Sequence, residues 1–462
     1  MSAHVPPWRL SSRVVGMPYR TGPDALEVSE LPRVLGLRDA TMLVVSSVIG
    51  VGIFFTPGGV ARHLPSAGWF FAAWLAGGAL ALAGALANAE LGTMFPRAGG
   101  NYVYLRAAYH PIAGFLVGWL SFFAIFAGTI ATLAEGFALS LASFVPLGPT
   151  AKTVVAVAVL WIASGVNAYA TRAGVALNTA TAYLKIAALV ALVVLGPLVG
   201  HDRAPAAPFT PAGTASLEGF GVALSPVIFS YLGWNASVYV AGEIASPGRN
   251  LPRSLFWGLG ICTAIYMLVT ATFVHALGME RLVGMPDVGF QAGSVLFGAR
   301  GSLIVAGIML ASVFGCLGAN VLVGPRIAYA MATDGLFFRG AARLSRRART
   351  PWIAVLVQAA TATVLVLAFD DLDRVLDYTT FAIVLATIAD TTALYVLRVR
   401  APDRPRPYVA AGYPLVPLLY VLANVGVGVA MVRARPVECL TGVGVLLSGA
   451  PVYFAFARRR GR

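Results

Sequence analysis

The chain has 462 residues, of which 58% are hydrophobic and only 11% are charged. A soluble domain carries about 25% charged residues, so this composition excludes an ordinary water-facing surface and indicates an integral membrane protein. The formal net charge is +14. Because the charges lie between long apolar runs rather than on one face, we expect no nucleic-acid partner.

The first 38 residues are polar and rich in arginine, and they lack an apolar core of signal-peptide length. We interpret 1–38 as a cytoplasmic N-terminal tail, mostly disordered and not cleaved. The three cysteines are far apart in the sequence and predict neither a disulfide framework nor a zinc site. We expect no metal and no cofactor.

Twelve apolar runs follow the tail, each long enough to cross a bilayer, which takes about 20 residues. They are 39–61, 68–94, 112–144, 152–170, 175–199, 217–242, 254–278, 301–332, 351–369, 375–397, 413–432 and 437–457. We therefore predict an all-α membrane protein of about 12 transmembrane helices. A short cytoplasmic tail, 458–462, ends the chain.

The distribution of positive charge predicts the orientation. An even number of spans puts both termini on one side of the membrane. The segments on that side contain 23 arginines, against eight cations on the other. Positive residues concentrate on the cytoplasmic side, so we predict a multi-pass protein of the cell membrane with both termini in the cytoplasm.

The first span contains two glycines near its middle, in the run Ser46-Ser47-Val48-Ile49-Gly50-Val51-Gly52-Ile53-Phe54. One interpretation is a small-residue face for close helix packing. The other is an unwound segment, since glycine leaves a helix readily and non-helical backbone within a membrane must line a cavity or bind something. The candidate substrate-binding residues in this span are Ser46, Ile49, Gly50, Val51, Gly52 and Ile53.

The sixth span carries a matching interruption between Ser225 and Asn235, with Pro226 and then Gly233. Spans one and six begin two five-span halves, and interrupted helices at matching positions of two halves point to a transporter site. The candidate residues here are Phe229, Ser230, Tyr231 and Gly233.

Two broken helices offer opposite electrostatic ends. The free N–H groups at the start of a second half attract a carboxylate. The carbonyls at the end of a first half attract an ammonium group. Together they suit a zwitterionic α-amino acid, over which Phe229 and Tyr231 are expected to close.

Further motifs occur in a characteristic order along nearly the whole chain. They are Ile49-Gly50-Val51-Gly52-Ile53-Phe54, Glu90-Leu91-Gly92, Pro96-Arg97-Ala98-Gly99-Gly100-Asn101, Tyr231-Leu232-Gly233-Trp234-Asn235, Pro247-Gly248-Arg249-Asn250-Leu251-Pro252-Arg253, Gly324-Pro325-Arg326, Asp334-Gly335-Leu336-Phe337 and Arg406-Pro407-Tyr408. In these motifs the chain resembles amino acid permeases of the amino acid–polyamine–organocation superfamily. Within that superfamily it looks most like bacterial relatives of the L-type amino acid transporters.

The resemblance implies two inverted five-helix repeats of the LeuT type, here 39–199 and 217–397, plus two extra helices within 413–457. It implies amino acid transport by alternating access, with substrate bound at the breaks in helices 1 and 6. Phe229 matches the family's aromatic gate. Val51 departs from the family's usual serine or alanine, which predicts a narrower pocket without a hydroxyl contact.

Lys185 lies near the centre of the fifth span, too far from either end to reach water easily. One interpretation is a structural lysine whose charge is satisfied by backbone carbonyls. By resemblance, Lys185 matches a lysine of sodium-independent relatives that stands where others hold a sodium ion. It is therefore our candidate coupling residue, connecting the first and fifth helices and serving as an alternative proton carrier.

Other ionisable side chains lie within or beside the spans. Glu135 and Asp390 face either the permeation path or local polar partners, and we favour local pairing. Glu90, Glu243 and Arg326 are at predicted cytoplasmic helix ends, where we expect ion pairs.

Several functional alternatives remain open from the sequence. No nucleophile with a base is grouped near a membrane face, so we expect no enzyme. A non-transporting amino acid sensor and a polyamine or amine transporter stay as alternatives. The predicted partners are a small-molecule amino acid, the lipid bilayer and, if uptake is proton-coupled, a proton. Antiport by exchange and symport with protons are both open, and no obligate protein partner is inferred.

Overall fold

The computed structural model describes residues 31–169, 171–199, 216–346, 349–369 and 372–460. Its longer helices are α1 (Leu37–Val48), α2 (Gly52–His63), α3 (Ala67–Met94), α5 (Pro111–Leu120), α6 (Ala127–Leu141), α7 (Pro149–Tyr169), α8 (Thr171–Val199), α9 (Leu217–Ser230), α11 (Pro247–Leu282), α12 (Val288–Phe297), α13 (Gly301–Val323), α15 (Trp352–Ala368), α16 (Leu372–Arg400), α17 (Leu415–Ala434) and α18 (Pro436–Arg460). Shorter helices are α4 (Asn101–Ala108), α10 (Ala236–Tyr239), α14 (Pro325–Thr333), the π-helix η1 (Ser121–Phe126) and the 3-10 turns η2 (Ala241–Glu243), η3 (Gly298–Arg300) and η4 (Arg339–Ala342).

The prediction of an all-α membrane protein is confirmed. Among the described residues, nine helical segments are long and apolar enough to cross a membrane, and the bent pair α1–α2 makes a tenth. The other two predicted spans correspond to the shorter helices α9 and α15. The apolar helix α12 was not predicted, and its ten residues are too few to cross a bilayer.

The first span breaks where its glycines predict. Helix α1 ends at Val48, and Ile49 leaves the helix with ψ at 95°. Helix α2 begins at Gly52, and the two axes differ by 49°. The interpretation of this run as an unwound segment is therefore confirmed, and an uninterrupted packing face is excluded.

The sixth span breaks later than its proline. Helix α9 continues through Pro226 and ends at Ser230. Tyr231 to Asn235 form turns before α10. Gly233 has a φ of +92°, a left-handed conformation that side chains with a Cβ rarely adopt. Gly233 is thus the residue that lets the chain leave the helix.

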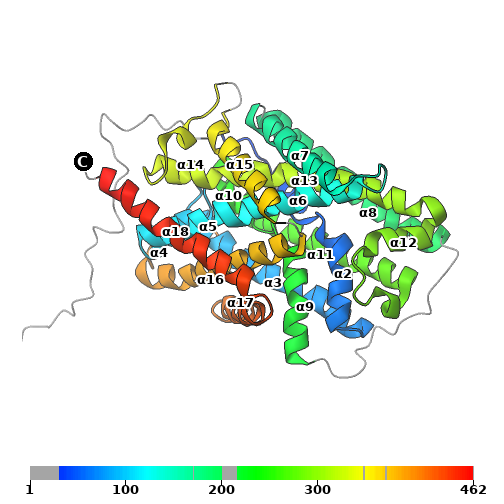
Figure 1. Cartoon of the computed structure of the whole chain (residues 1–462). Coiled ribbons are helices and arrows are strands. Elements are labelled where there is room, and N and C mark those ends of the chain that lie inside the picture. The colour runs from blue at the N-terminus through cyan, green and yellow to red at the C-terminus, as the bar shows by residue number, and fades with distance from the viewer. Residues whose placement is uncertain (1–30, 170, 200–215, 347–348, 370–371, 461–462) are drawn as a thin grey trace, which may run out of the picture.

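The first span lies at the centre of the bundle. Every residue from 40 to 54 is buried, and α1 packs against α8, α11 and α13. In contrast, α17 lies at the lower edge of the bundle and α18 crosses its front in Figure 1, and only 33% and 22% of the residues in their apolar windows are buried. A helix that is apolar all round must face protein or lipid, so the first span faces protein and the last two suit a lipid surface.

The ends of the predicted tails lie partly outside the described residues. Residues 1–30 and 461–462 lie outside the described part of the chain. The internal segment 200–215, which contains Arg203, also lies outside it. The described part of the N-terminal tail joins the exit of the sixth span. The Leu35 amide donates to the Glu243 carbonyl at 2.9 Å, and the Ala245 amide donates to the Leu35 carbonyl at 2.9 Å.

Candidate functional site

The two breaks contact each other directly. A Cβ added at Gly233 would lie 2.7 Å from the Ser47 carbonyl oxygen, and one added at Gly52 would lie 2.8 Å from the Ser230 Cα. Thr56 Oγ1 is 2.8 Å from Ser230 Oγ across the same junction. The end of α1 therefore lies beside the turn after α9, and the start of α2 lies beside the end of α9.

Side chains from α8 and α13 bind the carbonyls at the end of α1. Lys185 Nζ on α8 donates to the Ser46 carbonyl at 3.1 Å and to the Ile49 carbonyl at 2.8 Å. The Ser312 hydroxyl also donates to the Ile49 carbonyl at 3.2 Å, and Cys316 Sγ donates to that of Ser47 at 3.1 Å. These donors occupy carbonyls that an intact helix would bond internally.

Lys185 is fully buried and connects the fifth and first spans. Its two carbonyl partners match both the structural and the coupling interpretation of this lysine. Carbonyl oxygens at the C-terminal end of a helix favour a cation. The ammonium group therefore occupies a position with the chemistry of a cation site.

Tyr266 on α11 connects the two breaks, and sequence reasoning missed it. Its hydroxyl lies 2.8 Å from the Val48 carbonyl and 2.7 Å from the Ser230 carbonyl. A hydroxyl carries one proton, so it donates to one of these carbonyls at a time. Nothing in the sequence distinguishes this tyrosine from others in the spans, because its role depends on two carbonyls that are 218 and 36 residues away in the chain.

The start of α2 offers the complementary polarity. The first N–H groups of a helix have no acceptor within the helix, and α2 begins at Gly52. The first recorded bond from this end is from the Phe54 amide to the Val51 carbonyl, at 3.1 Å. The amides of Gly52 and Ile53, together with the helix dipole, give this end an affinity for a carboxylate.

The aromatic candidates do not lie on one side of the break. Phe229 belongs to the same buried cluster as Val51, whose side chain lies against Gly136 of α6. Tyr231 packs instead against Tyr266, with ring centroids 5.1 Å apart, and its hydroxyl donates to the Trp74 carbonyl at 3.2 Å. The two rings therefore pack in different clusters, and the expectation that both close over one ligand stays a prediction.

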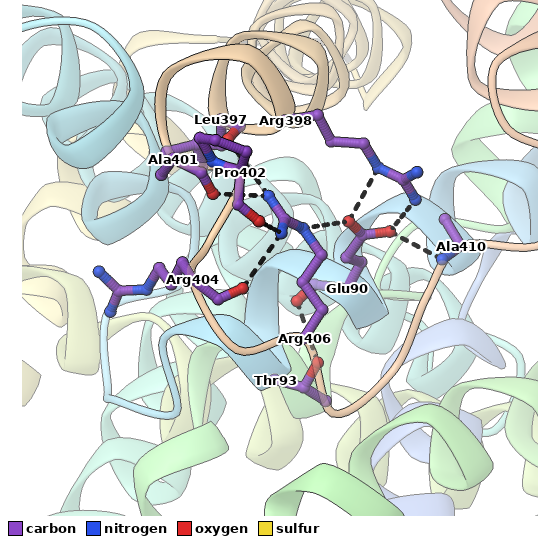
Figure 2. A network of polar contacts seen from close by, with 9 residues as sticks. All are labelled: Glu90, Thr93, Leu397, Arg398, Ala401, Pro402, Arg404, Arg406 and Ala410. Atoms are coloured by element: carbon purple, nitrogen blue, oxygen red, sulfur yellow. Dashed lines mark hydrogen bonds and ion pairs between the residues drawn. The ribbon is translucent and has the colours of Figure 1, made fainter.

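The expected ion pairs at the helix ends form. Arg326 donates to both carboxylate oxygens of Glu243, at 2.9 and 3.1 Å, and both side chains are buried. Figure 2 shows the second pair: Arg398 donates to both oxygens of Glu90, at 3.0 and 2.6 Å, and Arg406 approaches the same carboxylate at 3.3 Å.

A backbone group completes this Glu90 network. The Ala410 amide donates to Glu90 Oε2 at 2.7 Å. The network therefore connects the end of α3 to the end of α16 and to the segment that follows it. These partners lie near helix ends, and none of these hydrogen bonds of the two pairs involves the residues of the breaks.

Of the two candidate intramembrane acids, Glu135 is half-buried on α6. Asp390 is buried on α16, and the expected local pairing is wrong for it, since both its oxygens lack a hydrogen-bond partner among the described residues. All three cysteines are free and buried. No group of three or more potential metal ligands occurs within the described ranges.

A bundle of membrane-length helices, with two broken spans in contact at its centre, defines a secondary transporter. The sequence profile of the amino acid permease family matches residues 35–445. The chain belongs to this family, which confirms the resemblance seen in its motifs. It is a multi-pass membrane transporter rather than an enzyme.

Individual relatives are similar over almost the whole chain. The serine/threonine exchanger SteT of Bacillus subtilis (strain 168) is 30% identical over 438 residues, covering 94% of this chain and 99% of that protein. The Asc-type amino acid transporter 1 of Mus musculus is 28% identical, covering 93% of this chain and 82% of that protein. The large neutral amino acids transporter small subunit 2 of Homo sapiens is 28% identical, covering 92% and 80% respectively.

Proposed function

We propose that this permease exchanges small neutral amino acids across the cell membrane, without sodium, by alternating access at the paired breaks. The observation that carries the proposal is the contact between an unwound first span and an unwound sixth span. The amides of Gly52 and Ile53 would bind the substrate carboxylate. The carbonyls around Ser230 and Gly233 would bind its amino group.

The side chains around the breaks are apolar, which favours a substrate with an uncharged side chain. Val51 and Phe229 share a buried apolar cluster with Leu133 and Cys316. This wall suits a small apolar or hydroxyl side chain better than a charged one. The Bacillus relative is a serine/threonine exchanger, which agrees with that size and polarity.

Lys185 supports independence from sodium. A sodium ion needs several oxygen ligands, and carbonyl oxygens at a helix break supply them in transporters of this architecture. Here the ammonium group already holds the carbonyls of Ser46 and Ile49. We propose that Lys185 replaces the coupling ion and transmits movement between the first and fifth spans.

The orientation and repeat structure complete the proposal. Both termini would be cytoplasmic, with repeats 39–199 and 217–397 related by inversion and 413–457 outside them. The Glu90 and Glu243 ion pairs would then form the cytoplasmic end. We propose that the chain transports without an obligate protein partner, which purification and reconstitution of this chain alone would test directly.

Exchange in proteoliposomes tests the function. Vesicles loaded with unlabelled serine should take up labelled serine rapidly in choline buffer, and empty vesicles should take up much less. Threonine and alanine should compete, whereas arginine and putrescine should not. Binding of serine without flux would instead indicate a sensor, and competition by putrescine would indicate an amine transporter.

A further inference from the structure

Asp390 lines a small cavity beside the break of the sixth span. The cavity has a volume of about 20 Å³, enough for a water molecule. Its wall includes Leu232, Gly233, Trp234 and Asn235, the turn between α9 and α10. The cavity is therefore enclosed in part by the break at which the substrate's amino group is proposed to bind.

The π-helix η1 forms another part of the wall, through Ile125 and Phe126. Such segments interrupt the regular hydrogen bonding of a helix and occur often at functional sites. Asn320 of α13 contributes a third wall. The third, sixth, eighth and tenth spans thus meet around one buried carboxyl group.

The carboxyl group of Asp390 has no compensating charge. It is 1% exposed, and neither oxygen has a hydrogen-bond partner among the described residues. Of the arginines on its own helix, Arg398 pairs with Glu90 and Arg400 donates to the Ala108 carbonyl at 2.9 Å. The third, Arg374, is exposed and lies near the other end of the helix. An ionised carboxylate in this environment is strongly unfavourable.

Three polar side chains of the cavity donate to carbonyls of their own helices. The hydroxyls of Thr129 and Thr387 donate to carbonyls of their own helices, Ile125 and Ile383, at 2.7 and 2.9 Å. Asn320 Nδ2 donates to the Cys316 carbonyl at 2.9 Å. The wall also carries the donor groups of Trp234, Asn235 and Tyr239, yet neither Asp390 oxygen has a hydrogen-bond partner among the described residues. A protonated Asp390 can donate into the cavity, whereas an ionised Asp390 has no bonded donor to stabilise its charge.

The titratable groups that face Asp390 are phenols. They belong to α4, α10 and α17 and to the turn after α4, and they are Tyr104, Tyr239, Tyr420 and Tyr109. Tyr104 is fully buried, and its hydroxyl also lacks a hydrogen-bond partner among the described residues. No basic side chain of the described part of the chain pairs with Asp390, so a bound proton is the simplest means of neutralising it.

We propose that Asp390 is a proton-binding site that couples proton entry to net amino acid uptake. The carboxyl group is protonated in the closed cavity and releases its proton when the segment Leu232 to Asn235 moves and admits water. The proposal rests on the proposed amino acid transport and adds a proton-driven mode to exchange. Lys185 is not the carrier in this scheme, because its ammonium group is held by two carbonyls.

Reconstituted protein in sodium-free vesicles separates the two claims. Serine exchange at equal pH measures the transport function. Serine accumulation under an inward proton gradient, with a trapped pH-sensitive dye reporting acidification of the lumen, measures proton coupling. For one proton per serine, each pH unit should support about tenfold accumulation, because it is a tenfold ratio of proton activity.

The variants sharpen the test. Asp390→Asn should lower the ratio of gradient-driven uptake to exchange about tenfold, while Asp390→Glu should keep serine-dependent acidification. Asp377→Asn is the control, because Asp377 is on the same helix but pairs with Arg435 at 3.1 Å. Its ratio should equal that of the wild type.

Each outcome decides the proposal. Wild-type exchange without serine-dependent acidification would overturn the proton site and leave the transport function standing. Unchanged proton coupling in Asp390→Asn would do the same. Absence of any exchange by the wild type would instead reject the transport function. If Asp390→Asn does not fold, Asp390→Glu decides the test. Serine-dependent acidification that is seen with the wild type and retained by Asp390→Glu supports the proton site. Loss of this acidification in Asp390→Glu counts against the site.

Discussion

Replacing Lys185 by methionine should greatly impair transport. Methionine keeps most of the length and apolar volume of lysine but removes the ammonium group. The change leaves the Ser46 carbonyl without this donor and the Ile49 carbonyl with Ser312 alone. The C-terminal end of α1 would then lose its connection to the fifth span.

The magnitude follows from the two contacts. A hydrogen bond from a charged donor contributes about 1.5–3 kcal/mol, and two of them hold the break in place. Relief of the buried charge offsets part of this sum, so we expect a net loss of about 3 kcal/mol in the organised break. Since about 1.4 kcal/mol corresponds to a factor of ten, the binding-competent fraction should fall about a hundredfold.

Exchange of labelled serine at concentrations below saturation measures this fraction. The natural control is Lys152→Met, because Lys152 is the only other lysine in the chain and lies near the start of α7, away from the breaks. Thermal unfolding in detergent checks that both variants fold. Wild-type exchange by Lys185→Met would refute the coupling role.

Three further substitutions test the breaks and the buried ion pair, two of them with a control variant. Tyr266→Phe removes the hydroxyl that joins the two breaks and should destabilise the protein by about 1–3 kcal/mol, seen as a lower melting temperature; an unchanged value would contradict the bridge. Glu243→Gln breaks a buried ion pair and should cost about 3–5 kcal/mol, whereas Asp377→Asn breaks a more exposed pair and should cost about 1 kcal/mol or less by the same measurement. Gly52→Ala should abolish serine exchange, because its Cβ would lie 2.6 Å from a serine hydroxyl of α9. Gly59→Ala meets open space on the same helix and should retain exchange.

The carbonyls at the two breaks depend on hydrogen bonds from side chains of other helices. One tyrosine hydroxyl serves the carbonyls of both breaks, and one lysine serves two carbonyls of α1. These carbonyls would be bonded internally in a regular helix. Unwinding therefore makes the first span depend on side chains of α8, α11 and α13, and movement of those helices changes the break directly.

Local sequence was sufficient for the architecture and for the position of the first break. Apolar runs of membrane length have one stable form in lipid, a helix that satisfies its own backbone. Gly50 and Gly52 predicted the position of the first break. The interruption predicted in the sixth span agrees with the observed break within a few residues. Pro226 was misleading about the second break, because a proline within a helix loses only one amide bond and α9 continues past it.

Only the tertiary structure decided which side chains serve these breaks. Tyr266, Ser312 and Cys316 bind carbonyls that are more than 200 residues away in the chain, and no periodicity or spacing encodes such contacts. The same holds for Asp390. Its sequence position identified a carboxyl group in a span, but its lack of a partner and its position beside the break of the sixth span depend on how four spans pack together.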